Sequence, residues 1–197
     1  MAEYADDMAA LLRALDVGKA VVCGLSMGGY VAFEMVKRHP EAVQGLVLAN
    51  TRAEADTSDA RKNRDEMIHA VERGGAEAIV DRMIPKLFAE SSLVAMPQVV
   101  EHVRTMIASS PPKGVIGALR AMKDRDDNTD LLPEIDVPTL VIAGREDALI
   151  SPRRSKALAD AIPGALYTLI PEAGHLTPME QPIQTSRVVA EFLEALP

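Results

Sequence analysis

The chain has 197 residues, 48% of them hydrophobic and 25% charged, a composition typical of one globular domain with a real core, or one domain with a sizeable insertion. Its net charge of −8, with no run of Lys or Arg, argues against nucleic acid or an anionic membrane as a partner. A single Cys, an acidic N-terminus unlike a signal peptide and the lack of any long apolar run favour a reduced, cytoplasmic setting without a disulfide framework or a membrane span.

The first predicted element is an amphipathic helix. Its apolar residues fall on one stripe at helical spacing: Tyr4, Met8, Leu11, Leu12 and Leu15. Gly18 follows at the point where a left-handed residue commonly ends a helix. We therefore expect a helix over residues 4–15, ended through Gly18.

A short apolar strand over residues 20–23 then runs into the pattern G-x-S-x-G, centred on Ser26. A serine that attacks a carbonyl must stand on a strained, tight turn, and we expect Gly24 and Gly28 to remove side chains that would collide there. The helix predicted over residues 30–38 would direct its free N–H groups at the serine, which places the Met27 N–H to bind an oxyanion. The alternative is a glycine-rich connection between strand and helix with no catalytic role.

The middle of the chain is predicted to be helical. After an apolar strand over residues 43–49, the sequence becomes charged and shows no strand alternation. Four helices are expected there, one from Thr57 or Ser58 to Arg73, and others over residues 76–84 (stopped by Pro85), 97–109 and from Pro112 through Met122. We interpret residues 53–124 as an all-helical insertion.

The last part of the chain returns to alternating elements. Strands are predicted over residues 138–143 and 166–170, and helices over 152–162 and 180–196. Strands that alternate with helices imply right-handed crossovers and a parallel sheet covered on both faces. The predicted fold class is therefore α/β, with about four parallel strands flanked by helices. Its core is made of residues 1–52 and 125–197.

Three residues with complementary chemistry directly follow predicted strands: Ser26, Asp147 and His175. Ligands of open parallel sheets gather at the carboxyl ends of the strands, so we expect these side chains at one edge. A histidine can take the proton of the serine, and a carboxylate can fix the tautomer of that histidine. Asp147 could instead be a surface carboxylate, in which case Glu146 is the substitute for the acid.

Other reactive residues point to no further chemistry. His39, His69 and His102 are most simply interpreted as solvated, and the histidines are too scattered for a metal site. Cys23 is expected to be a small buried hydrophobe. The many Met and few aromatic residues predict a deformable pocket lining rather than an array of charged selectors. No cofactor or metal is expected.

Several segments resemble the α/β-hydrolase superfamily, in particular its small esterases, non-haem haloperoxidase-like enzymes and 3-oxoadipate enol-lactonases. These segments are Cys23–Gly29, Leu46–Thr51, Gly144–Asp147 and Gly174–Leu176. The resemblance implies Ser26 as the nucleophile, Asp147 as the acid, His175 as the base, the Met27 N–H as an oxyanion donor and residues 53–124 as a helical cap. Members of the family normally carry about four strands, a helix and an oxyanion loop ahead of the point where this chain starts, so the resemblance implies a partial fold.

The leading functional hypothesis is hydrolysis of small, fairly apolar carboxylic esters through an acyl-enzyme on Ser26. An enol-lactonase acting on an acidic lactone is the alternative, and it needs a basic group such as Arg52, Arg145 or Arg153 near the pocket. A hypothesis of another class is an inactive remnant that dimerises or binds a partner. Because the strand over residues 20–23 would lie at an apolar edge, we expect a homodimer or a higher homo-oligomer.

Overall fold

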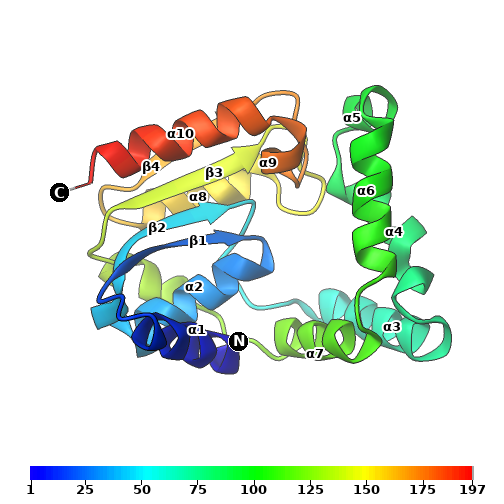
Figure 1. The fold of residues 1–197 in the computed structure, drawn as a ribbon, viewed down its shortest axis with the longest axis horizontal. Helices are drawn as coiled ribbons and strands as arrows, with labels where there is room; N and C mark the ends of the chain where they lie inside the picture. Colours follow the sequence, from blue (N-terminus) through cyan, green and yellow to red (C-terminus); the bar gives the residue numbers. More distant parts are fainter. Residues whose placement is uncertain (197) are drawn as a thin grey trace.

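The computed structural model describes residues 1–196 and contains a four-stranded parallel sheet in the order β1-β2-β3-β4. The strands are β1 Ala20–Leu25, β2 Val43–Ala49, β3 Thr139–Gly144 and β4 Leu166–Ile170. Leu25 pairs with Ala49, and Ala49 pairs with Ile142, so these strands end at the same edge of the sheet. The predicted α/β class with about four parallel strands is confirmed (Figure 1).

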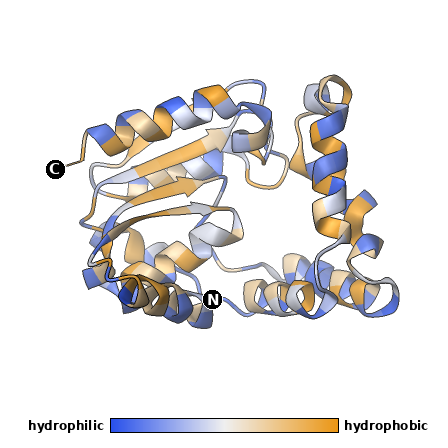
Figure 2. Cartoon of the chain, in the orientation of Figure 1, coloured by the Kyte–Doolittle hydropathy of each residue, from blue (hydrophilic) through white to orange (hydrophobic). Residues whose placement is uncertain are grey.

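Helices cover both faces of this sheet, so the apolar strands lie between helical layers (Figures 1 and 2). On one face lie α2 Met27–Arg38 and α8 Pro152–Ala161, which share a core with Leu46, Leu48 and Val141. On the other face, α10 Pro182–Glu194 packs Phe192 against Val47, Leu140 and Ile142. The remaining elements outside the middle segment are α1 Ala2–Ala14, which packs on α2, the short α9 Thr177–Glu180, and the 3-10 turns η1 Pro40–Ala42 and η3 Thr129–Glu134.

The chain between β2 and β3 contains the helices α3 to α7, which lie beyond the carboxyl ends of the strands (Figure 1), and residues 53–124 are called the helical insertion below. Its elements are α3 Ser58–Gly74, η2 Ala76–Ile79, α4 Val80–Leu87, α5 Glu90–Ala95, α6 Pro97–Ala108 and α7 Pro112–Lys123. The two connections of this segment to the sheet run side by side. The Asn128 N–H donates to Ala53 O at 3.0 Å, and the Ala55 N–H donates to Asp127 Oδ2 at 3.0 Å.

Helix α1 differs from its prediction in which side faces the core. Ala5 and Ala9 are buried against α2, whereas most of the predicted stripe is exposed, with Met8 at 43% and Leu15 at 63%. Small alanines allow the two helices to approach closely, which turns the larger apolar side chains outward. Asp16, with φ 54°, takes the left-handed position after the helix that was expected of Gly18.

Two helix boundaries were also wrong. Pro85 does not stop a helix, because α4 continues through it to Leu87 after a 3-10 turn over Ala76–Ile79. The final helix begins at Pro182 rather than Glu180, with Pro at its first position, where the missing N–H costs no hydrogen bond. None of the helices in residues 1–196 is long and apolar enough to cross a membrane.

Candidate active site

Ser26 occupies a strained turn between β1 and α2. Its backbone has φ 52° and ψ −111°, a conformation that costs energy for a residue with a side chain. Three hydrogen bonds hold its backbone there: the Ser26 N–H donates to Ala49 O at 2.9 Å, and Ser26 O accepts from Thr51 Oγ1 at 2.8 Å and from the Gly29 N–H at 3.0 Å. Met27 is the first residue of α2, so its N–H adjoins Ser26 at the positive end of the helix.

The glycines around Ser26 have roles that differ from the prediction. A Cβ on Gly24 would lie 2.4 Å from the carbonyl group of Gly28, so this position requires glycine. A Cβ on Gly28 would meet nothing within 4 Å, so the expected collision at Gly28 is wrong. Gly29 is the second crowded position, since its Cβ would lie 2.3 Å from Thr51 Oγ1, the group that holds the Ser26 carbonyl.

Asp147 and His175 are hydrogen-bonded partners at the ends of β3 and β4. His175 Nδ1 lies 2.8 Å from Asp147 Oδ2, and both side chains are almost fully buried. Asp147 Oδ1 accepts the N–H groups of Leu149 at 2.8 Å and Ile150 at 2.9 Å, which fixes the carboxylate. Glu146, the alternative acid, is exposed.

Asn50 is a buried polar residue that the sequence analysis did not identify. It follows β2 with φ 49°, a left-handed conformation that Asn adopts more readily than most residues. Its Nδ2 donates to Asp147 Oδ2 at 3.0 Å and to Gly174 O at 3.2 Å, while its Oδ1 accepts from Thr177 Oγ1 at 2.9 Å. Asn50 thus ties the carboxylate to the loop that carries His175. Its place directly after a strand, at the same sheet edge as the other three, is the signal that could have found it.

Glu180 was also missed, and it fixes the loop of His175 from the other side. Its carboxylate accepts the N–H groups of Gly174 at 2.8 Å, Leu176 at 3.3 Å and Ala89 at 2.7 Å. Ala89 belongs to the helical insertion, and so does Leu87, whose carbonyl accepts the His175 N–H at 3.1 Å. The insertion is therefore bonded directly to the histidine loop.

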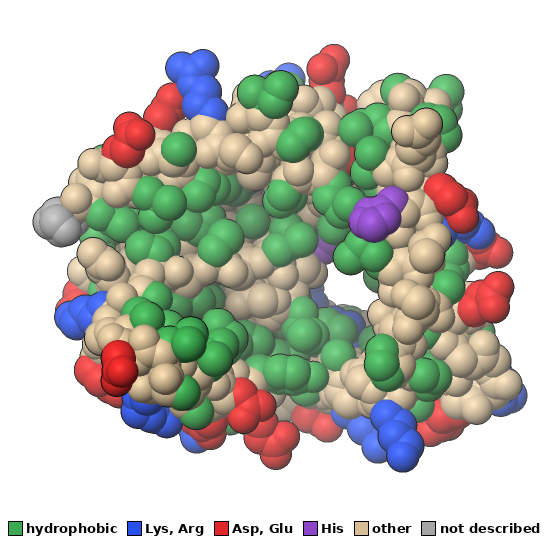
Figure 3. Space-filling model, in the orientation of Figure 1, with side chains coloured by type: hydrophobic (Ala, Val, Ile, Leu, Met, Phe, Trp, Pro, Cys, Tyr) green, Lys and Arg blue, Asp and Glu red, His purple; other side chains and the backbone are tan. Residues whose placement is uncertain are grey.

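Ser26 and His175 line one pocket of about 570 Å³ between the strand ends and the helical insertion (Figure 3). Four methionines also line it, as expected for a deformable lining: Met27, Met67, Met83 and Met122. The expectation of few charged selectors was wrong, because the lining also includes Arg52, Asp56, Arg64, Arg82 and Lys86. Of the three basic residues proposed for an acidic substrate, Arg52 lines this pocket, whereas Arg145 and Arg153 are exposed elsewhere.

The remaining reactive residues lie away from this site. Cys23 is exposed on the edge strand β1, so its expected burial was wrong. His39 is half-buried and lies 2.7 Å from Asp6, which links α2 to α1, whereas His69 and His102 are exposed. Within residues 1–196, no three His, Cys, Asp or Glu side chains are arranged to hold a metal ion.

Comparison with known proteins gives a consistent family. The model of the alpha/beta hydrolase fold family matches residues 1–182. A thermophilic esterase from Thermogutta terrifontis, solved with malate bound, superposes with a TM-score of 0.95 at 44% identity, over 98% of this chain and 71% of the esterase. An enol-lactonase from Burkholderia xenovorans LB400 gives a TM-score of 0.88 at 27% identity, over 96% of this chain and 71% of the lactonase. A protein of Mycobacterium tuberculosis named as a non-heme bromoperoxidase is 31% identical over 96% of this chain and 74% of its own length.

Proposed function

This chain belongs to the α/β-hydrolase family, and from that premise we propose that it is a serine hydrolase that cleaves small carboxylic esters through an acyl-enzyme on Ser26. The observation that carries the proposal is the buried Asp147–His175 hydrogen bond in a pocket that Ser26 also lines. A strained serine, a histidine and a fixed carboxylate are the groups that acyl transfer requires.

In the proposed mechanism each residue performs one step. Asp147 Oδ2 accepts the Nδ1–H of His175, which leaves Nε2 free to take the proton of Ser26 as its oxygen attacks the ester carbonyl. The Met27 N–H stabilises the oxyanion, and His175 then returns the proton to the leaving alkoxide. Water activated by the same histidine attacks the acyl-enzyme and releases the acid. The helical insertion, as a cap over the pocket, keeps bulk water from the acyl group.

Labelling by a fluorophosphonate probe tests the proposal without knowledge of the natural substrate. We expect the probe to label Ser26, and we expect Ser26→Ala to lose both labelling and hydrolysis of short p-nitrophenyl esters. Ser91→Ala and Ser151→Ala are matched controls, since both serines are exposed and neither lines the pocket. Retention of more than about a tenth of the wild-type kcat in Ser26→Ala would contradict the assignment, because loss of a triad member costs orders of magnitude.

Met27 is the oxyanion donor that the turn supplies. Loss of one donor from an oxyanion hole costs about 10²–10³ in kcat, so with the Met27 N–H alone we expect a slow esterase. Activated aryl esters should react faster than alkyl esters, since a good leaving group depends less on oxyanion stabilisation. Similar kcat values on both ester types would show that a second donor is present.

Hydrolysis of an acidic lactone is the second candidate, and the presence of Arg52 in the pocket lining favours it. The enol-lactonase among the similar structures is consistent with this chemistry, which uses the same three residues. The two candidates are distinguished by measuring, in one preparation, the rate of ring opening of a carboxylated lactone and the rate of ester hydrolysis. If neither a lactone nor an ester is cleaved and no probe labels Ser26, the chain acts as a binding module.

Self-association through the β1 edge is a further part of the proposal. Strand β1 lies at the edge of the sheet, and α1, which packs on α2, exposes apolar residues that include Tyr4, Met8 and Leu11. Figure 3 shows hydrophobic side chains gathered between α10 and α1. Unpaired apolar edges recruit other strands, and a symmetric dimer is the commonest result. Light scattering at micromolar concentration tests this, and a stable 21.2 kDa species would contradict it.

A further inference from the structure

The charged groups around the pocket are predominantly basic, although the chain is acidic overall. Four cationic side chains line the cavity: Arg52, Arg64, Arg82 and Lys86. Among the described residues of the lining, Asp56 is the one carboxylate. Arg82 is paired with Glu66 at 2.8 Å, and Arg52 and Arg64 share Asp56, so these two arginines and Lys86 leave the lining with a net positive charge in a chain of net charge −8.

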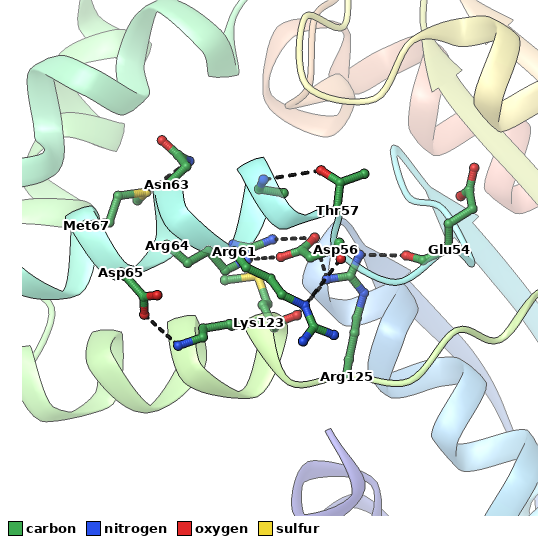
Figure 4. Close-up of polar contacts among 12 residues, drawn as sticks. Glu54, Asp56, Thr57, Arg61, Asn63, Arg64, Asp65, Met67, Lys123 and Arg125 are labelled. Atoms are coloured by element: carbon green, nitrogen blue, oxygen red, sulfur yellow. Dashed lines mark hydrogen bonds and ion pairs between the residues drawn. The ribbon is translucent and has the colours of Figure 1, made fainter.

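Asp56 is surrounded by three guanidinium groups (Figure 4 shows two of them). Its Oδ1 accepts Arg52 Nη2 at 2.7 Å and Arg125 Nη1 at 2.8 Å, and its Oδ2 accepts Arg64 Nε. The Asp56 side chain is fully buried, and the side chains of Arg125, Arg52 and Arg64 are 2%, 11% and 16% exposed. One buried carboxylate thus meets three buried or nearly buried cations.

Asp56 and its three arginines carry a formal net charge of +2. A protein interior tolerates a charge that is paired. An unpaired buried charge lowers the free energy of unfolding by roughly several kcal/mol. Arg125 is compensated by its surroundings: it donates to Met122 O and Glu54 O, both at 2.7 Å, and its guanidinium lies 4.0 Å from the centre of the Tyr30 ring. Arg125 is also absent from the pocket lining.

Arg52 differs from Arg125 because it lines the pocket, although the Nε of each is buried without an acceptor among the described residues. A planar guanidinium carries five N–H donors, so Arg52 can be held by Asp56 through Nη2 and still bind the carboxylate of a ligand in the pocket.

The distance between Arg52 and Ser26 limits how far the carboxylate of a substrate can lie from its ester carbonyl. Leu25 pairs with Ala49, so Ser26 and Arg52 follow the ends of neighbouring strands. Thr51, the residue before Arg52, donates from its Oγ1 to Ser26 O at 2.8 Å, and Ser26 and Arg52 line the same pocket. A carboxylate bound to Arg52 would therefore be a few carbon atoms from an ester carbonyl at Ser26.

We propose that the pocket binds substrates whose acyl part ends in a carboxylate, held by Arg52 with Arg64 beside it, while Asp56 positions the two guanidiniums. The inference rests on the proposed hydrolysis at Ser26 and specifies its substrate class, the short diacid monoesters and the corresponding carboxylated lactones. Arg52 and Arg64 act on the ground state and the transition state alike, because the carboxylate lies away from the bond that breaks.

Two esters of equal chain length test the proposal, p-nitrophenyl hydrogen glutarate and p-nitrophenyl pentanoate, with uncatalysed hydrolysis subtracted. We expect kcat/KM of the wild-type chain to be at least about tenfold higher for the glutarate ester, as a hydrogen-bonded ion pair implies. Arg52→Gln should lower kcat/KM at least tenfold more for the glutarate ester than for the pentanoate, mostly through KM. Arg187→Gln is the matched control, because Arg187 is exposed on α10, and it should leave the ratio unchanged.

Calorimetric titration of the wild-type chain with glutarate separates failure of the inference from failure of the proposed function, since it needs no turnover. Arg52-dependent glutarate binding without ester hydrolysis would support the subsite and reject the hydrolase. Hydrolysis of both esters at equal kcat/KM, with no glutarate binding, would overturn the subsite and leave the hydrolase standing. If Arg52→Gln does not fold, Arg52→Lys, which keeps the charge but loses the planar fork, should still show weaker glutarate binding; wild-type affinity in Arg52→Lys would overturn the proposal.

Discussion

Glu180 Oε2 accepts the backbone N–H of Ala89 at 2.7 Å, a buried hydrogen bond that joins two residues 91 positions apart in the chain. The other oxygen of Glu180 binds the N–H groups of Gly174 and Leu176, on either side of His175. One carboxylate therefore fixes both the histidine loop and the part of the helical insertion that touches this loop.

Replacement of Glu180 should reduce both stability and turnover. Glu180→Ala leaves the buried N–H groups of Gly174 and Ala89 without an acceptor, at about 1–3 kcal/mol each, so we expect the free energy of unfolding to fall by several kcal/mol. Glu180→Gln retains one carbonyl acceptor and should recover part of the loss in kcat. Urea unfolding and esterase kinetics measure both effects. Glu191→Ala, an exposed carboxylate on α10, should change neither, and equal kcat in Glu180→Ala and wild type would show that the loop needs no such support.

Asn50→Ala should lower kcat with little change in KM. The substitution removes the 3.0 Å hydrogen bond to Asp147 Oδ2, and a bond to a charged group is worth about 1.5–3 kcal/mol, or roughly 10- to 100-fold in rate. Asn50 is absent from the pocket lining, so substrate binding should be retained. A rise in KM at constant kcat would instead assign Asn50 to substrate binding.

Asp56 should contribute a pH-dependent part of the stability. Burial by itself would raise the pKa of Asp56, but hydrogen bonds from Arg64 and Arg125 outweigh burial and hold the pKa below its ordinary value of 3.8. The folded chain then binds the proton less tightly than the unfolded chain. The contribution is fully present above pH 3.8 and is lost as the pH falls through the lower pKa of the folded state.

Asp56→Asn tests this contribution. The variant leaves three guanidiniums without their carboxylate, and the loss of one partner from a buried ion pair costs about 3–5 kcal/mol near neutral pH. The deficit relative to wild type should shrink as the pH is lowered below 4 in urea unfolding experiments, a range set by that pKa. Asp160→Asn, on an exposed ion pair with Lys156, is the control. A deficit that is constant with pH would contradict the assigned charge state.

Two adjacent glycines should respond differently to alanine. The methyl group of Gly29→Ala would overlap the buried Thr51 side chain, so we expect a loss of about 1–3 kcal/mol in the free energy of unfolding. Gly28→Ala meets nothing within 4 Å and lies in α2, where Ala stabilises a helix by up to about 1 kcal/mol relative to Gly. Equal thermal stability of the two variants would contradict the crowding at Gly29.

The sequence allowed the architecture to be predicted because the strands carry strong local signals. The bounds of β2 and β4 were predicted correctly, since each is an apolar run flanked by clear breaks. The positions of Ser26, Asp147 and His175 at the strand ends followed from the same reasoning. Asn50 and Glu180 could not be found in this way, because their roles depend on contacts 127 and 91 residues away. The exposure of the apolar stripe of α1 was missed for a similar reason. Helix periodicity shows that one side of a helix is apolar, but not which side a neighbouring helix covers.

The paired connections at Ala53 and Asn128 make the helical insertion a separable piece of chain. Because its two ends leave the sheet within one hydrogen bond of each other, a short turn in its place would close the backbone without moving β2 or β3. Most of the pocket wall, including Arg64, Arg82 and the methionines of α3, α4 and α7, is encoded within that piece. Ser26, Asp147 and His175 are all encoded outside it. Exchange of one contiguous stretch of gene would therefore change the pocket wall and leave the residues at the strand ends in place, provided that the new stretch supplies the contacts of Leu87 and Ala89 with the His175 loop and with Glu180.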